Sequence, residues 1–413
     1  MSKDRPPPTA RGAGVVVGIG ETEMSKASPS SALELAVEAS LAALADAGIE
    51  PRDVDGLLRF GAPFETVSHA SLIRSLGVTD LGFYGEIPLG GEAAAGMIHH
   101  AVAALASGRA SVVLCYRAIK QSGGNRFGRA DQQRHGGSPE DDVFVEGDAA
   151  FTWPYWMMAP AHLFALWATR YLHEAGISEQ QFRQAVGRVA LDQRRYANSR
   201  PGSLLHARPL TWEQFDGGRM ISWPLNLFML CLENDGAAAV VLTTCERARD
   251  CAGSSVSVLA SSQSLAPLRE PFSFYADDLL QIFPAERARR LWMDAGIAPA
   301  DVDVAELYDA TSLMTLLSLE LWGFLERGRA WQHVTEHGIG LGSPLPVNTH
   351  GGHLSDGYVH GMTGILEAVR QVRGSATNQV AGARVAFFGA LSGSSVVLST
   401  PELATSLDKG STR

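Results

Sequence analysis

The sequence predicts a duplicated α/β fold, and an internal repeat is the feature that indicates it most directly. DAGIEPRDVD at residues 46–55 recurs as DAGIAPADVD at residues 294–303, with eight of ten positions identical. Each copy closes an alanine- or leucine-rich segment that we expect to be helical, Ala32–Ala47 and Ala285–Ala295. Glycine is a natural helix C-cap because it adopts the left-handed conformation at little cost. The same helix and turn are therefore expected in both halves.

The segments after each repeat correspond as well. An apolar strand, a helix and a second apolar strand are expected at 56–60, 92–108 and 111–116 in the first half and at 304–309, 357–374 and 383–391 in the second. Two copies of such a unit imply a duplicated α/β fold, for which a five-layer sandwich is one solution.

A long insertion separates the two units, at about 119–230. Within it, helices are expected at Pro160–Ala175 and Glu179–Ser199, after the aromatic segment TWPYWMMAP at 152–160. An insertion of this length often supplies a wall of the substrate site. Its aromatic side chains fit either that role or plain core packing, and the sequence does not choose between them.

Composition and charge limit the classes of function. The chain has 413 residues, 46% hydrophobic and 19% charged, with a net charge of −10 and no lysine- or arginine-rich run. This balance argues against a nucleic-acid partner, and no apolar run is long enough for a membrane span. The first 14 residues lack an apolar core, so no signal peptide is expected. Four cysteines without CxxC spacing suit a reducing cytoplasm, where we expect the protein to be.

The stretch PVNTHGGHLSDGYVHGMTG at 346–364 is the richest in chemistry-bearing residues. A zinc site would need His350, His353 and His360 to converge within about 2.1 Å of one metal ion. Beyond Asp356 no acidic or cysteine residue nearby would complete the ligand set, so the pattern disfavours a metal. Hydrogen bonding within the loop is the simpler interpretation for His353 and His360.

These segments together resemble the thiolase superfamily, in its sterol-carrier-protein-type branch. The resemblance covers nearly the whole chain and includes VVVGIGETEMSK (15–26), GRMISWPLNLFMLCLENDGAAAVVL (218–242), ELYDA (306–310) and the histidine-containing stretch. It implies the duplicated thiolase fold, a five-layer α-β-α-β-α sandwich with a long inserted loop and helical region. The first half is expected to span 1–250, including the insertion, and the second 251–413.

Departures from thiolases are informative about the chemistry. The place of the nucleophilic cysteine reads PLGGEAAAG (88–96), with Gly90 or Gly91 nearest the expected position, and the loop of the second cysteine reads FFGALSGSSVVL (387–398). One position that carries histidine in thiolases carries Tyr358 here. Another, which carries histidine or asparagine in thiolases, carries Tyr308. Glycine cannot form an acyl-enzyme, so thiolase chemistry is excluded at that position.

This combination resembles the lipid-transfer-protein-type retro-aldolases of steroid side-chain degradation. LYD, VNTHGG, YxHGM, VRQxRG and NQVAG are shared with that branch. The resemblance implies a lyase that cleaves a β-hydroxyacyl-CoA, foremost a 17-hydroxy steroid C20-carboxyl-CoA, to a 17-ketosteroid and propionyl-CoA. Two alternatives remain: a non-catalytic scaffold that binds acyl-CoA or lipid, and a thiolase-type acyltransferase.

The retro-aldol interpretation assigns roles to particular residues. We expect Tyr308 and Tyr358 to be catalytic, one as base with a lowered pKa and the other as acid. Tyr308 is favoured as the base, although the sequence does not assign the two roles. His350 would assist, for example by polarising a carbonyl. The residues expected to contact or support the substrate are Gly351, Gly352, Gly91 and Asp309.

The same resemblance implies the assembly. It predicts a homodimer core flanked by a companion protein with an OB fold and a zinc ribbon, forming a heterotetramer. The small-molecule partner would be a steroid acyl-CoA. No cofactor besides the CoA of the substrate, and no metal ion, is expected in this chain.

Overall fold

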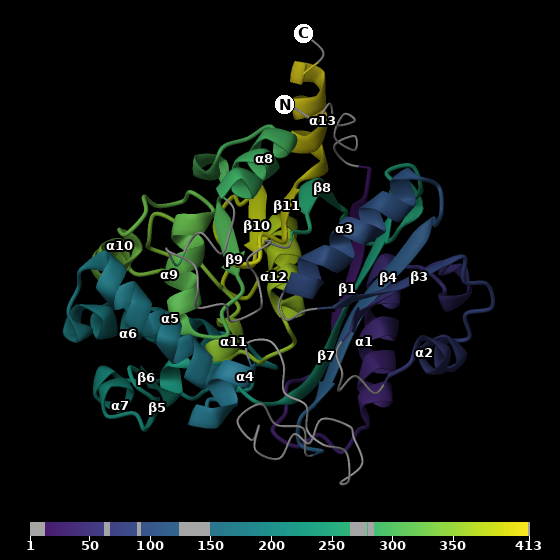
Figure 1. Cartoon of the computed structure of the whole chain (residues 1–413). Coiled ribbons are helices and arrows are strands. Elements are labelled where there is room, and N and C mark those ends of the chain that lie inside the picture. The colour runs from purple at the N-terminus through teal and green to yellow at the C-terminus, as the bar shows by residue number, and fades with distance from the viewer. Residues whose placement is uncertain are drawn as a thin grey trace.

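The computed structural model describes residues 13–61, 67–88, 92–123, 149–264, 279 and 285–411. Helices surround one large mixed sheet (Figure 1). Its strands are β1 (Val15–Glu21), β2 (Gly56–Gly61), β3 (Phe83–Pro88), β4 (Val112–Lys120), β7 (Asp235–Thr243), β8 (Val256–Ser262), β9 (Val304–Leu307), β10 (Val385–Gly389) and β11 (Ser395–Ser399). A separate pair is formed by β5 (Met220–Ser222) and β6 (Leu225–Asn226).

The described helices lie before, within and after the insertion. They are α1 (Ala32–Ala47), α2 (His69–Leu76), α3 (Glu92–Ala106), α4 (Ala149–Thr152), α5 (Pro160–Ala175), α6 (Glu179–Ser199), α7 (Trp212–Asp216), α8 (Ala285–Ala295), α9 (Ser312–Leu321), α10 (Ala330–His337), α11 (Gly352–Ser355), α12 (Met362–Arg373) and α13 (Pro401–Ser411).

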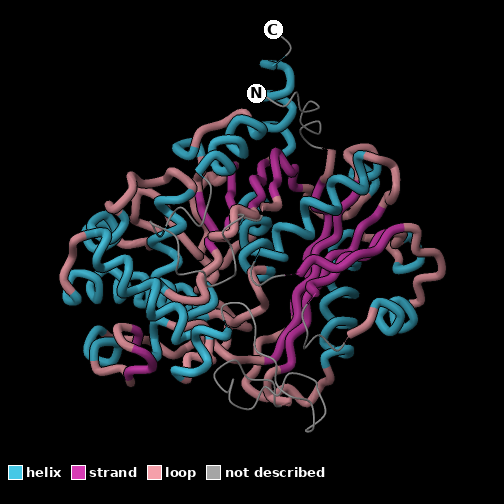
Figure 2. The backbone as a smooth tube through the Cα atoms, in the orientation of Figure 1, coloured by secondary structure: helices cyan, strands magenta, loops and turns pink. Residues whose placement is uncertain are grey.

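The strand order shows the duplication. The sheet runs β3-β2-β4-β7-β1-β8-β11-β10-β9, so that β1-β7-β4-β2 on one side of the centre mirrors β8-β11-β10-β9 on the other. The two sides meet where Val15 and Val16 of β1 pair with Ser257 and Val256 of β8. From that short junction the two sets of strands diverge (Figure 2).

The repeated decapeptide ends a helix and fixes the start of a strand in both halves. Gly48 and Gly296 end their helices at φ +67° and +71°. The last aspartate of each copy then fixes the start of a neighbouring strand. Asp55 accepts hydrogen bonds from the backbone N–H groups of Ser111 and Val112, and Asp303 accepts them from Arg384 and Val385.

The contacts between helices and strands define five layers. α1 packs on β1, β7 and β4, and α8 packs on β8, so these helices lie on the outer faces. α3 and α12 contact strands of both halves and each other, which places them in the middle layer. The duplicated α-β-α-β-α sandwich expected from the sequence is confirmed. The division of the chain at residue 250 stays a prediction.

The two long helices of the insertion are built as expected, but elements of the second half are shorter, among them β9, which ends at Leu307 rather than at residue 309. Helices α5 and α6 have the predicted bounds, and α6 contacts α9, α10 and α11 beside the end of β9. The helix predicted over 357–374 begins only at Met362, because His360 and Gly361 turn the chain at φ +49° and +87°. Residues 357–361 therefore form a turn, which frees Tyr358 from any helical face. No helix among the described residues is long and apolar enough to cross a membrane.

Candidate active site

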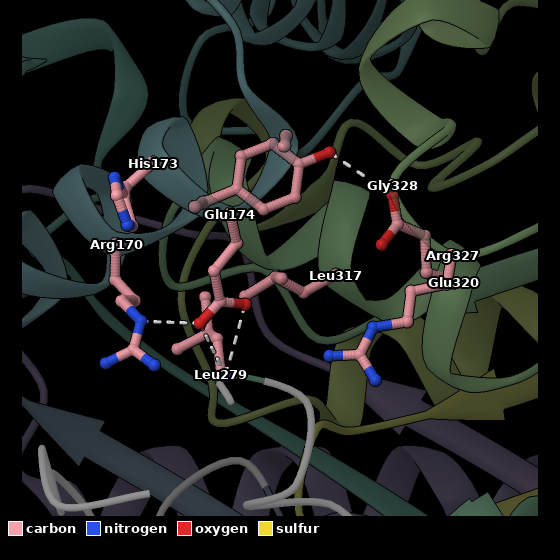
Figure 3. A pocket seen from close by; sticks show the side chains of 10 residues that line it. Arg170, His173, Glu174, Leu279, Leu317, Glu320, Arg327 and Gly328 are labelled. Carbon is pink, nitrogen blue, oxygen red and sulfur yellow. Dashed lines mark hydrogen bonds and ion pairs between the residues drawn. The ribbon is translucent and has the colours of Figure 1, made fainter. Parts of the chain in front are cut away.

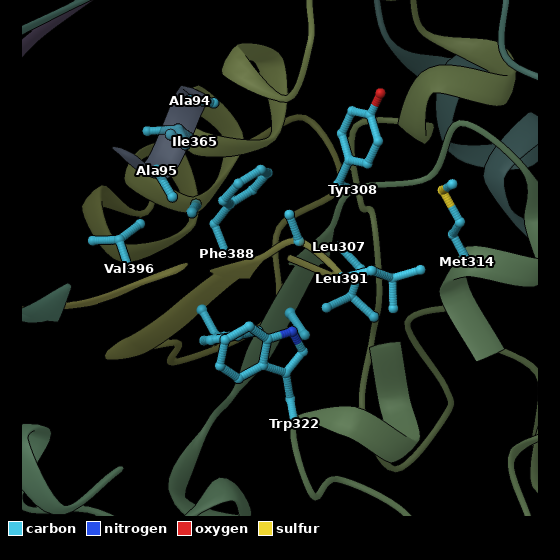
Figure 4. Packing of buried hydrophobic residues seen from close by; sticks show 14 of the residues in the cluster. Ala94, Ala95, Leu307, Tyr308, Met314, Trp322, Ile365, Phe388, Leu391 and Val396 are labelled. Atoms are coloured by element: carbon cyan, nitrogen blue, oxygen red, sulfur yellow. The ribbon is translucent and has the colours of Figure 1, made fainter. Parts of the chain in front are cut away.

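Two tyrosines from distant parts of the chain meet in the interior. The hydroxyl oxygens of Tyr308 and Tyr358 lie 2.8 Å apart, and the residues are 9% and 5% exposed. Tyr308 directly follows β9, where its N–H donates to the carbonyl of Gly389 at 2.9 Å. Its ring points away from the hydrophobic packing around Leu307 and Leu391 (Figure 4). The end of a strand thus presents a phenol to the turn at 357–361.

The position of Tyr358 is fixed by its backbone. Asn234, just before β7, accepts a hydrogen bond from the N–H of Tyr358 at 2.6 Å. The same side chain donates to the carbonyl of Tyr358 at 3.4 Å. A buried amide that satisfies both backbone groups of one residue holds that residue in a single conformation. The N-terminal half of the chain therefore positions one of the two phenols.

Two histidines pack against the phenol rings. The ring of His353 lies 5.0 Å from that of Tyr308 and 5.1 Å from that of Tyr358, measured between centroids. The ring of His360 lies 4.6 Å from that of Tyr358 and 4.3 Å from that of Phe60 on β2. These are the two histidines that sequence reasoning assigned to loop hydrogen bonding.

His353 holds the histidine-containing loop to the end of β9. Its Nδ1 lies 2.7 Å from the carboxylate of Asp309, and its Nε2 accepts the N–H of Gly361 at 3.0 Å. Contacts at both ring nitrogens hold the imidazole in one orientation. The other oxygen of Asp309 accepts from Gln193 at 2.9 Å. Asp309 thus joins the loop to the end of β9, and its supporting role stays a prediction.

Burial sets the electrostatics of the phenols. It raises the pKa of Tyr308 well above its usual value of 10, and Tyr358 adds to that rise. Burial also raises the pKa of Tyr358, opposed by the hydrogen bond with Tyr308 and by the positive charge of Arg117. The expectation that one tyrosine would have a lowered pKa is wrong, because loss of solvation exceeds the favourable contacts. Both phenols are neutral at pH 7.

His350 lies in a buried network of charged side chains. Its Nδ1 is 2.8 Å from the carboxylate of Glu306, and the residue is 2% exposed. Burial alone would lower its pKa, but the charge of Glu306 raises the pKa of His350 to about 9. Arg200 bridges Asp356 and Glu21 in the same network. None of the ring contacts described above joins His350 to the tyrosines, so its auxiliary role stays a prediction.

The predicted substrate-binding glycines occupy tight positions. Gly351 has φ +113°, and a Cβ there would lie 2.6 Å from that of Ala197. Gly352 has φ +60°, and a Cβ there would collide with the carboxylate of Asp309. The N–H of Gly351 donates to the carbonyl of Asn348 at 2.8 Å, and contact of either glycine with a substrate stays a prediction. Gly91 lies outside the described residues.

The thiols do not provide a nucleophile. Burial raises the pKa of Cys115, inside β4, and raises that of Cys231 to about 12. Cys231 lies at the site, where its N–H donates to the carbonyl of Ala310 at 2.9 Å. A neutral buried thiol is a poor nucleophile, so the acyltransferase alternative finds no support here. No group of three or more histidine, cysteine, aspartate and glutamate side chains within the described ranges is placed to hold a metal ion.

Two cavities lie on the side of the insertion. One of about 920 Å³ is bounded by α5 and α9 and combines Arg170, Glu174, Glu320 and Arg327 with apolar Leu279 and Leu317 (Figure 3). Another of about 310 Å³ is open to the surface beside Tyr155 and Trp156, which are 76% and 77% exposed. Core packing is therefore wrong for these two aromatic residues, whereas Trp167 is buried.

Comparisons with known proteins place the chain in a family. Residues 274–400 match the family model described as thiolase C-terminal domain-like. A 17-hydroxy-3-oxo-4-pregnene-20-carboxyl-CoA lyase from Mycobacterium tuberculosis is 39% identical over 90% of this chain and 94% of its own length. The chain belongs to the thiolase-like steroid side-chain-cleaving aldolases.

Further relatives of this aldolase-family chain agree. A steroid side-chain-cleaving aldolase from Thermomonospora curvata is 38% identical over 89% of this chain and 92% of its own length. The solved structure of an Ltp2-ChsH2(DUF35) aldolase superposes with a TM-score of 0.84 at 36% identity, covering 95% of this chain and 99% of that one. Human mitochondrial 3-ketoacyl-CoA thiolase, at 16% identity and a TM-score of 0.66 over 95% of this chain and 100% of its own, shares the fold.

Proposed function

We propose that this protein is a carbon–carbon lyase that cleaves a 17-hydroxy steroid C20-carboxyl-CoA to a 17-ketosteroid and propionyl-CoA. The buried Tyr308–Tyr358 pair, with 2.8 Å between its hydroxyl oxygens, is the observation that carries the mechanism. The names of the two relatives at 38–39% identity support the substrate class.

The tyrosine pair suits a proton relay better than catalysis by a base that is already ionised before the reaction. Because both pKa values are raised, neither tyrosine is a phenolate before the reaction. One phenol oxygen takes the proton of the substrate's β-hydroxyl while its own proton passes across the 2.8 Å hydrogen bond to the other oxygen. In the same step the second phenol gives its own proton to the α-carbon, so each phenol ends with one proton. Neither phenol has to exist as a free anion.

Atoms and electrons balance in this scheme. The O–H electrons become the second bond of the new 17-carbonyl, and the bond between C17 and the α-carbon breaks. Its electron pair forms the thioester enolate, which the relayed proton converts to propionyl-CoA. The N–H of Gly352 is the protein group that we assign to the enolate oxygen. No covalent bond to the protein forms.

The acyl-CoA-binding scaffold is the alternative that the experiment must exclude. Purified protein is incubated with the 17-hydroxy ester and, in parallel, with the 17-deoxy ester, which has no β-hydroxyl proton to give. We expect 17-ketosteroid and propionyl-CoA in equal amounts from the first ester and neither from the second. Binding of both esters without cleavage, also in the presence of the companion described next, would establish the scaffold.

We further propose a companion protein of the OB-fold and zinc-ribbon type, bound to a homodimer of this chain in a heterotetramer. The support is the solved aldolase of 36% identity, whose description pairs it with ChsH2(DUF35). Co-expression followed by light scattering on the purified complex tests this. A mass of two copies of each chain is expected, and a monomeric chain that ignores the companion would refute it. A cytoplasmic location stays a prediction.

A further inference from the structure

A buried arginine from the N-terminal half reaches the tyrosine pair. Arg117 lies on β4 and is 1% exposed. Its guanidinium carbon lies 4.4 Å above the ring of Phe60, and its Nε donates to Nδ1 of His360 at 3.3 Å. His360 in turn packs on Tyr358, with 4.6 Å between ring centroids. Arg117, His360 and Tyr358 form a continuous contact from the central strand of the first half to the reacting phenol.

The chemistry of the contact fixes the state of His360. A guanidinium only donates, so Nδ1 of His360 accepts and the ring's proton is on Nε2. Burial, Arg117 and His353 hold the pKa of His360 well below its usual value, which keeps the ring neutral. The residue also adopts φ +49°, a conformation uncommon outside glycine, although histidine, asparagine and aspartate adopt it more often than other residues. Such strain persists where the surroundings require one side-chain position.

The charge of Arg117 acts on one member of the pair. Burial lowers the pKa of Arg117 to about 9, and Tyr358 is the group that opposes this effect, so the guanidinium and this phenol interact directly through the low-dielectric interior. The groups that act most on Tyr308 are Tyr358, Cys231 and Asp309, none of which is a cation. The titratable or charged groups facing Tyr358 are Tyr308, Cys231, Asp309, Arg117, His353 and His360.

We propose that Arg117 is a positioning residue of the tyrosine pair: it holds the Tyr358 ring through His360 and stabilises negative charge on the Tyr358 oxygen while the proton moves. The inference rests on the proposed function, since it concerns the same relay. It makes the two phenols unequal, with Tyr358 the one that better bears transient charge.

The first experiment measures that charge stabilisation without turnover. Replacing Tyr358 by 3,5-difluorotyrosine gives a more acidic phenol, whose ionisation is followed by absorbance. In the Arg117→Met background we expect the midpoint to rise by about 1 to 3 pH units. Arg194→Met is the matched control, because Arg194 is also buried and donates from Nε into the same loop, to Ser355 at 3.0 Å. The control should leave the midpoint in place.

The second experiment measures turnover. Arg117→Met should lower kcat by about 10- to 100-fold, with KM changed less than about threefold, as expected for loss of a group that acts on developing charge. Difluorotyrosine at position 358 should restore part of kcat in this background, which repair of packing alone would not do. Arg117→Lys keeps the charge but loses the planar fork, so it should retain most of the midpoint and less of kcat.

The outcomes separate this inference from the proposed function. A folded Arg117→Met protein with an unchanged midpoint overturns the role of Arg117, even where the native enzyme cleaves its ester. If the native protein cleaves no ester, the proposed function fails while the titration still decides the charge interaction. Arg117→Gln, which is neutral yet keeps a donor for His360, gives the same measurement if the methionine variant does not fold.

Discussion

The tyrosine pair makes a quantitative prediction about its own removal. Tyr308→Phe and Tyr358→Phe each delete one oxygen of the 2.8 Å hydrogen bond and keep the buried ring. Loss of one relay member should lower kcat by about 10³-fold, or roughly 4 kcal/mol in the barrier, within the range of general acid–base catalysis. The hydroxyl left behind loses its partner in a buried site, which should cost about 1 to 3 kcal/mol of stability.

The relay adds a condition that separate acid and base roles would not. Because the two phenols act as one unit, the double variant should be about as slow as either single variant. Steady-state and single-turnover kinetics on the 17-hydroxy ester measure this. Tyr196→Phe is the control, since its buried hydroxyl donates to Ile339 at 3.1 Å outside the pair and should cost stability without a comparable loss of kcat. Near-native activity in either single variant, or losses that multiply in the double variant, would refute the relay.

Three further predictions concern the support of the site. Pairing with Glu306 raises the pKa of His350 to about 9, above its unfolded value of about 6.5. The pairing therefore stabilises the fold by up to about 3 kcal/mol below pH ~6.5, and this stabilisation is lost as the pH rises to 9. The melting temperature should fall over this pH window more in the native protein than in His350→Gln. Gly352→Ala should lower the free energy of unfolding by more than about 2 kcal/mol in denaturant titrations, because its Cβ would collide with the Asp309 carboxylate at φ +60°; unchanged stability would contradict the tight approach. Cys231→Ala should keep kcat within a few fold, because the thiol's pKa of about 12 leaves it neutral, and complete loss of turnover would revive the acyltransferase.

Much of the fold could be predicted because its signals are local. Each copy of the repeated decapeptide contains the glycine that ends its helix, Gly48 or Gly296. Each copy also contains the aspartate that fixes the next strand, Asp55 or Asp303. The same turn is therefore predicted in both halves. The two long helices of the insertion were predicted with their bounds. The start of α12 was missed because the positive φ of His360 depends on contacts with Arg117 and Phe60, more than 200 residues away.

The site was predicted only in part. Tyr308 and Tyr358 came from the resemblance to retro-aldolases, which marks positions but says nothing of burial, so the direction of their pKa shift was wrong. The contact between Asp309 and His353 joins residues 44 positions apart, and a sequence has no local signal for such a pair. Asn234 and Arg117 were missed for the same reason: each comes from the first half and contacts the loop of the second.

Rapid mixing of the native protein with the 17-hydroxy ester, followed by mass spectrometry of both products and the intact protein, tests the central claim most directly. We expect 17-ketosteroid and propionyl-CoA to appear together in equal amounts, while the mass of the protein stays unchanged at every time point. A transient protein species heavier by an acyl group would contradict cleavage without a covalent intermediate, and an intact ester would contradict the lyase itself.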